Sequence, residues 1–225
     1  MRSAFSIALL LFAATAGGLT GCGSSETSEA AVSANIGGGD IGDATDASAG
    51  AKPKVQAPPK VRIETSHGTI TLVLDPEKAP LTVRNFLTYV DSGHYDGTVF
   101  HQVVDGYMVL GGGYTKDLQE KPTSGAIRNE AHNGVPNARG TIAMARQADA
   151  IDSSTCQFFI NLADNEGLDH KDRETAEGYG YCVFGHVTDG LDVAEKIGKS
   201  PVQDIEGFNM IPAQPVLIRS VKRVN

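Results

Sequence analysis

The residue types that most often carry chemistry are few in this chain of 225 residues, and their spacing does not favour metal binding or a serine nucleophile. The six histidines are scattered, and no CxxC or HExxH spacing occurs that would hold a metal ion. Ser153 and Ser154 do not lie in a GxSxG turn, which presents the nucleophile of α/β-hydrolases. The sequence therefore predicts no metal site, and a hydrolase is the least favoured class.

The stretch 98–113, TVFHQVVDGYMVLGGG, is better suited to binding. Two apolar runs, 99–104 and 107–110, are separated by Asp105-Gly106 and followed by three glycines. An Asp-Gly pair between such runs predicts a β-hairpin with a type I′ turn, in which both central residues have positive φ. We interpret this hairpin as one wall of a substrate groove that presents apolar and amide side chains.

The chain carries a net charge of −8 and is 40% hydrophobic and 20% charged, which is typical of a globular domain. This acidic balance, with no basic patch, argues against nucleic acid as a partner. We expect a monomer.

The N-terminal segment is typical of a signal for export. Arg2 precedes an apolar run at 5–11, and Leu19-Thr20-Gly21-Cys22 resembles the bacterial lipoprotein signal, in which cleavage leaves a lipidated Cys22. The alternative is an ordinary signal peptide with a chance cysteine. The lipoprotein interpretation predicts a signal peptide at 1–21 and attachment at the periplasmic face of a membrane. That membrane would be the outer one where the organism has one, because glycine follows Cys22.

Residues 22–59 are predicted to be the lipidated cysteine and a disordered tether, because Gly, Ser, Ala and Asp dominate without any hydrophobic period. A folded domain is predicted at 60–225. Its two cysteines, Cys156 and Cys182, each lie beside a strand-like run. Two buried free thiols are the preferred interpretation, and a disulfide stays open.

Hydrophobic periodicity predicts mostly strands in this domain. Alternation at 61–65 and 70–74 indicates a hairpin, and a helix with Thr82 as its N-cap and Gly93 just past its end has an apolar stripe at positions 83, 86, 87 and 90. Further strands are predicted at 140–145, 157–162, 181–187 and 215–224, with a short helix at 191–197 and a solvated charged loop at 164–180. This pattern fits a sandwich or a closed barrel.

Several of these segments together resemble one family. Phe100-His101, Asp105-Gly106-Tyr107-Met108 and Gly111-Gly112 are similar to the cyclophilin signature FHRxxxGFMxQGG, and GTIAMA, QFFI and VFG follow in the family's order. The resemblance covers residues 60–225. It implies an all-β fold, an eight-stranded antiparallel closed barrel capped by two α-helices. It also implies peptidyl-prolyl cis/trans isomerase activity on proline-containing polypeptides, without a cofactor.

The resemblance also implies roles for particular side chains. It assigns the catalytic positions to Gln102, Phe159 and Gln157. It assigns the remaining substrate contacts to pocket, backbone-binding and rim residues: Tyr107, Met108, Leu110, Leu168, Ala145, Arg146, His101 and Tyr181. Phe158 and Phe159 are neighbours on a strand, so we expect one to lie in the core and the other to face the groove.

Several positions depart from the family pattern: Tyr107, Gly167 and Tyr181 stand where the family more often has other aromatic residues or histidine, and two further departures bear directly on catalysis. Gln102 stands where the family has its catalytic arginine, and Leu110 stands where a glutamine orients that arginine. A neutral donor forms a weaker hydrogen bond than a charged one. We therefore expect reduced isomerase activity in the folding of exported proteins, with Arg146 as a candidate replacement for the missing charge. The alternative function is a chaperone or docking module that binds proline-containing peptides with little or no turnover.

Overall fold

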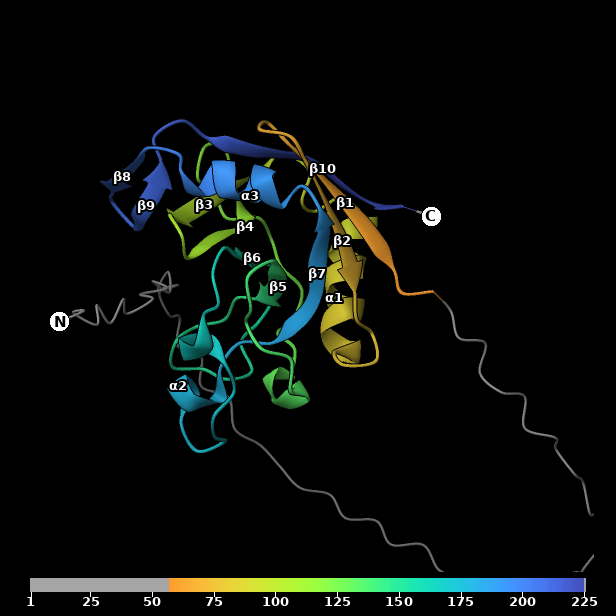
Figure 1. Ribbon diagram of the computed structural model, residues 1–225. Coiled ribbons are helices and arrows are strands. Elements are labelled where there is room, and N and C mark those ends of the chain that lie inside the picture. The colour runs from red at the N-terminus through yellow and green to blue at the C-terminus, as the bar shows by residue number, and fades with distance from the viewer. Residues whose placement is uncertain (1–56, 225) are drawn as a thin grey trace, which may run out of the picture. The chain divides into compact units, whose positions relative to one another are not determined.

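The computed structural model describes residues 57–224, so the predicted signal peptide, Cys22 and nearly all of the tether lie outside the described residues. Eight strands form a closed barrel in the order β1-β10-β3-β4-β6-β5-β7-β2, and every neighbouring pair is antiparallel (Figure 1). This confirms the predicted barrel and excludes the sandwich. The strands of the barrel are β1 (Lys60–Thr65), β2 (Thr69–Leu74), β3 (Thr98–Val104), β4 (Met108–Thr115), β5 (Thr141–Met144), β6 (Phe158–Asn161), β7 (Val183–Asp189) and β10 (Val216–Val224).

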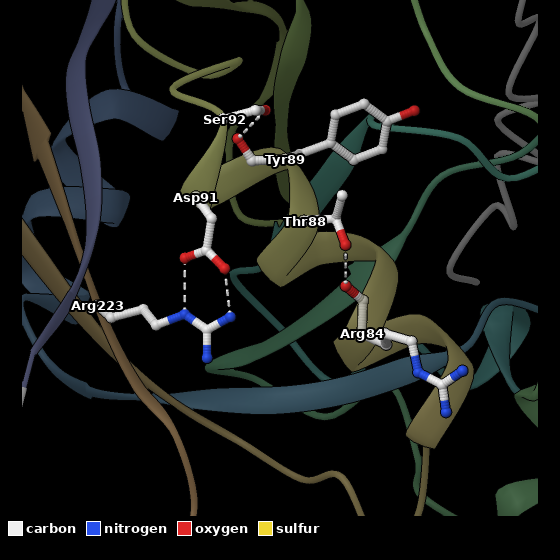
Figure 2. Close-up of polar contacts among 6 residues, drawn as sticks. All are labelled: Arg84, Thr88, Tyr89, Asp91, Ser92 and Arg223. Carbon is white, nitrogen blue, oxygen red and sulfur yellow. Dashed lines mark hydrogen bonds and ion pairs between the residues drawn. The ribbon is translucent and has the colours of Figure 1, made fainter.

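Two helices accompany the barrel, as the resemblance implied, together with shorter turns. α1 (Pro80–Asp91) lies near β10, and α3 (Leu191–Gly198) lies near β2, β3 and β4. The shorter pieces are α2 (Ala176–Tyr179) and two 3₁₀ turns, η1 (Ala131–Asn133) and η2 (Glu166–Leu168). Figure 2 shows the exposed end of α1, where Asp91 accepts two hydrogen bonds from Arg223 of β10 at 2.7 and 2.5 Å. An exposed pair of this kind adds at most about 1 kcal/mol to stability.

The start of α1 differs from the prediction. The helix begins at Pro80, so Thr82 lies inside the first turn and is not the N-cap. The cap comes instead from the buried Glu130, whose carboxylate accepts the N–H groups of Leu81 at 3.1 Å and Thr82 at 2.9 Å and the Thr82 hydroxyl at 2.8 Å. A carboxylate at a helix N-terminus satisfies unpaired donors and complements the helix dipole. The predicted apolar stripe is buried, and Gly93 adopts φ +68° past the C-terminus, as expected.

The interior of the barrel is the main hydrophobic core. Phe158 lies at its centre, with Phe86, Tyr95 and Phe100 at ring-centroid distances of 5.7, 5.4 and 6.2 Å. Both domain cysteines are buried and free, which confirms the free-thiol interpretation. Burial raises the pKa of Cys156 to about 11 and that of Cys182 to about 12.

The β3–β4 hairpin forms as predicted, but its turn is of another type. Gly106 has φ +64°, whereas Asp105 does not have a positive φ, so the turn is not type I′. The Tyr107 N–H donates to the Val104 carbonyl at 3.0 Å, and pairing resumes between Val104 and Met108. One positive φ is enough here because the loop is three residues long. Farther along β4, Gly112 has φ +92°, and a Cβ there would lie 2.9 Å from the rings of Phe158 and Tyr95.

A pair of strands near the C-terminus was not predicted. β8 (Val202–Ile205) and β9 (Phe208–Pro212) form a separate two-stranded ribbon, and β9 lies against β3 (Figure 1). The available signal was Gly207, which adopts φ +79° between the two strands. Its turn lies in a short polar stretch whose strands are mostly exposed, so periodicity did not reveal them.

Candidate active site

The strand register places a row of side chains on the outer face of the barrel. Gln102 of β3 is paired with Leu110 of β4, which is paired with Phe159 of β6, which is paired with Ala143 of β5. Directly paired residues project from the same face of a sheet. A register shift at His101 separates this row from Phe100, whose ring lies in the core. Gln102 and Leu110, the two departures from the family pattern that bear on catalysis, are therefore direct neighbours.

A second apolar cluster surrounds this row. Phe159 lies in it, whereas Phe158 lies in the interior core, so the expected division of the two phenylalanines is confirmed. The ring of Tyr181 meets that of Phe159 edge-on at 5.7 Å. The cluster brings together seven of the residues that were assigned to the site and adds three that were missed. The seven are Tyr107, Met108, Leu110, Ala145, Phe159, Leu168 and Tyr181; the three are Val135, Ala143 and Val183.

Gln102 is the polar member of the row. Its side chain is half-buried, and within residues 57–224 its amide forms no hydrogen bond to another group of the protein. A neutral amide beside Leu110 and Phe159 combines one hydrogen-bond donor with an apolar surface. Such an arrangement can hold an apolar ring and donate to an atom above it.

His101 and Gln157 lie beside the row. His101 was placed on the rim, but its side chain is buried, at 4% exposure, and packs against Tyr114 at 4.8 Å and Phe208 at 6.3 Å. The unpredicted strand β9 supplies Phe208, and β4 supplies the nearer ring of Tyr114. His101 Nδ1 and Gln157 Oε1 are buried without a hydrogen-bond partner among the described residues. Desolvation lowers the pKa of His101 to about 4, so the imidazole is neutral at pH 7.

Arg146 was expected to replace the charge of the missing catalytic arginine, but its guanidinium is already bound by the protein. Its guanidinium donates to the carbonyl oxygens of Gly180 at 3.0 Å, Gln147 at 2.8 Å and Ala148 at 3.0 Å, and also to Ala176. Arg146 follows the end of β5, and its Cζ atom lies 4.5 Å from the centroid of the Tyr181 ring. Burial lowers its pKa. The expectation that Arg146 replaces the missing arginine is wrong, because four of its five N–H groups already serve the protein. Tyr181, also expected on the rim, is buried, and its ring packs between Phe159 and the Arg146 guanidinium.

A network of buried asparagines supports the wall, and sequence analysis missed it. Asn165 donates to the Tyr107 carbonyl at 2.9 Å and to Asn161 at 2.7 Å, and Asn161 donates to Asn137 at 3.2 Å. Asn137 then donates to the Leu168 carbonyl at 3.0 Å. The loop 164–180 is thus not a solvated insertion alone, because part of it is buried in this wall. Asn161, a polar residue at the end of the apolar run QFFIN, was the signal.

Between residues 57 and 224, no group of three or more His, Cys, Asp or Glu side chains is placed to hold a metal ion. No helix in the same range is long and apolar enough to cross a membrane.

Comparison with known proteins agrees with this geometry. The family model described as cyclophilin type peptidyl-prolyl cis-trans isomerase/CLD matches residues 60–223. Peptidyl-prolyl cis-trans isomerase A of Dickeya dadantii is 48% identical over 162 residues, which cover 72% of this chain and 83% of that protein. Peptidyl-prolyl cis-trans isomerase B of Escherichia coli is 45% identical over 162 residues, or 72% and 97% of the two chains.

Solved structures show the same fold. A cyclophilin type peptidyl-prolyl cis-trans isomerase of Cryptosporidium parvum, crystallised in the presence of the dipeptide Ala-Pro, matches with a TM-score of 0.61 and 22% identity over 74% of this chain and 99% of that one. The cyclophilin AquaCyp293 of Hirschia baltica matches with a TM-score of 0.59 and 24% identity over 74% of each chain.

Proposed function

This chain belongs to the cyclophilin-type peptidyl-prolyl cis-trans isomerase family, and we propose that it isomerises prolyl peptide bonds with Gln102 as a weakened donor. The observation that carries the proposal is the row Gln102–Leu110–Phe159, in which a free amide donor stands two strands away from the aromatic floor. The proline ring binds over Phe159, and the prolyl nitrogen faces Gln102.

Prolyl isomerisation requires few chemical groups in the site. Resonance gives the amide bond a rotational barrier of about 18–20 kcal/mol, and no covalent bond breaks during isomerisation. When the bond twists, the nitrogen loses conjugation and gains an accessible lone pair. A donor aimed at that nitrogen stabilises the twisted state more than either planar form, which is the requirement for catalysis. The apolar cluster around Phe159 supplies the pocket for the ring.

The proposed rate is lower than that of a site with arginine at this position. A charge-assisted hydrogen bond is roughly twice as strong as a neutral one. Loss of one preorganised donor costs on the order of 10²–10³ in rate in other enzymes. Leu110 lowers the rate further, because it removes the polar neighbour that would hold the donor in place.

A protease-coupled assay on Xaa-Pro peptides tests the proposal. We expect wild type to exceed Phe159→Ala, and Gln102→Arg to exceed wild type by about tenfold or more. The double variant Gln102→Arg/Leu110→Gln should be faster than the two single changes predict, because the residues are direct cross-strand neighbours. A wild type no faster than Phe159→Ala contradicts the isomerase proposal.

The pairing of Gln102 with Leu110 also favours a second candidate, a module that binds proline-containing peptides without turnover. Both polar residues of the family pattern are replaced at this one paired position, whereas the apolar pocket is present. Calorimetric titration with an Xaa-Pro peptide separates the two functions. Binding that Phe159→Ala abolishes, in a wild type without isomerase activity, would support the module.

We further propose that the protein is exported and lipidated at Cys22, and that its clients are exported proteins. The support is the sequence Leu19-Thr20-Gly21-Cys22 after an apolar run. Mass spectrometry of the protein from membranes should find a chain that starts at a diacylated Cys22, and Cys22→Ser should release it from the membrane. An unmodified Cys22 in the mature protein contradicts this proposal.

A further inference from the structure

Arg146 is a buried cation that has no carboxylate partner among residues 57–224. Its side chain is buried, and within residues 57–224 its hydrogen bonds all go to backbone carbonyl oxygens. Burying a charge is costly unless hydrogen bonds compensate for the lost water. An arginine held in this way serves a precise geometric purpose, because its planar fork fixes several acceptors at once.

The acceptors come from two places in the chain. Gln147 and Ala148 follow β5 directly, whereas Ala176 and Gly180 belong to α2 and its end. The guanidinium therefore joins the end of β5 to the segment 176–180. It adds to the backbone hydrogen bonds at this end of β5, where the Met144 N–H donates to the Cys182 carbonyl at 3.0 Å.

The same guanidinium reaches the pocket through one ring. It lies 4.5 Å from the centroid of Tyr181, and that ring meets Phe159 edge-on at 5.7 Å. The Tyr181 N–H in turn donates to the Leu168 carbonyl at 2.9 Å. Movement of Arg146 would thus move two walls of the pocket, Tyr181 and Leu168, relative to Phe159.

We infer that Arg146 is a positioning residue that sets the width of the proline pocket by clamping residues 176–181 to the end of β5. The effect on turnover rests on the proposed isomerase function, whereas the clamp itself does not. Lysine cannot replace this arginine, because a single ammonium group can neither stack on Tyr181 nor reach four carbonyls. The change to lysine would keep the positive charge but lose the stacking on Tyr181 and the full set of hydrogen bonds to the carbonyl groups.

The experiment compares Arg146→Met and Arg146→Lys with wild type in the full chain. Arg223→Met is the matched control, because it removes an exposed arginine that also makes two hydrogen bonds, to Asp91 of α1 (Figure 2). Hydrogen exchange is followed at the Lys171 and Tyr181 amides, which donate within this loop to Gly178 and Leu168. Thermal unfolding is measured for each variant.

We expect both Arg146 variants to exchange at these two amides at least about tenfold faster than wild type and Arg223→Met, through local opening. KM for an Xaa-Pro peptide should rise by about tenfold, with kcat within about twofold, because a displaced wall weakens binding of planar and twisted forms alike. Where the wild type has no turnover, the peptide dissociation constant replaces KM, so failure of the isomerase proposal leaves this test intact.

Three results would overturn the inference. The first is unchanged exchange at both amides in Arg146→Met. The second is an Arg146→Lys variant that keeps wild-type KM and kcat although the amides of its loop exchange faster. Positive charge near the substrate, and not the clamp, would then determine peptide binding. A double-variant cycle with Tyr181→Leu adds a check: replacing Arg146 should have a clearly smaller effect on KM when the Tyr181 ring is absent. Equal effects in the two backgrounds also contradict the clamp.

Discussion

Two neighbouring phenylalanines on β6 show how differently the two faces of one barrel wall are built. Phe158 points inward and has aromatic neighbours from α1, β3 and the chain between them. Phe159 points outward, where Tyr181 is the one aromatic ring of the described residues that meets it, and both phenylalanines are at most 1% exposed. The inner face is packed by strands and a helix, whereas the outer face is closed by side chains from loops. The two phenylalanines are therefore equally buried, but Phe158 stabilises the core whereas Phe159 lies in the candidate site.

Phe158→Ala should have the largest effect on stability. Its ring fills the centre of the core, so the change leaves a cavity that the closed barrel cannot collapse around. We expect a loss of about 3–5 kcal/mol in the free energy of unfolding. Chemical denaturation monitored by circular dichroism measures it. A loss no greater than that of Phe159→Ala would contradict the distinction between the two faces.

The pH dependence of stability should show that His101, on the outer face, is packed as tightly as a core residue. Its pKa is about 4 in the folded chain against 6.5 in the unfolded chain, because burial disfavours the charged form. Between these two values the unfolded chain binds a proton that the folded chain does not. Stability should therefore fall as the pH drops from about 6.5 to 4, by up to about 3 kcal/mol.

Urea denaturation at pH 7 and pH 4.5 measures this loss. His101→Gln is the matched variant, because it cannot take up the proton and should lose less stability between the two pH values than wild type. A wild type and a variant with parallel pH profiles would mean that the imidazole is accessible to water.

Phe159→Ala should cost less stability than Phe158→Ala and more activity. The cavity it leaves adjoins loop side chains that can settle inward, so we expect a loss of about 2 kcal/mol. Peptide binding and isomerase activity should both be lost, because the floor of the pocket is gone. A stable variant that retains full peptide binding would place the proline ring elsewhere.

Leu110→Gln should have the smallest effect. Leu110 faces Gln102, whose half-buried amide can pair with the new side chain, so we expect a loss of about 1 kcal/mol. Its neighbour Val109 points into the core, where Val109→Gln would bury an amide without a partner and cost several times more. Denaturation midpoints of the two variants make this comparison on β4.

The inner face was largely predictable from sequence, and the outer face was not. Alternation at 61–65 and the helical stripe of α1 report which side chains turn inward, because strand and helix periods are local. The cap from Glu130 on α1 and the clamp from Arg146 join segments that are distant along the chain or lie in loops. No local pattern encodes such contacts. The resemblance to the family identified most of the residues on the outer face. That Gln102 is directly paired with Leu110 became visible only from the strand register of the structure.

The separate ribbon has a consequence for how this protein meets other copies of itself. Closing a sheet into a barrel leaves its strands no free edge, whereas β8 keeps one beside β9. Val202 and Ile205 of that strand are 43% and 39% exposed, which makes β8 the place where aggregation by strand addition would begin. Asp204 of β8, which accepts the Met210 N–H at 2.8 Å, and Glu206 in the following turn are both exposed, so strand addition between two copies would bring like charges close together. Charge thus opposes strand addition at β8, whereas the closed barrel has no strand edge to protect.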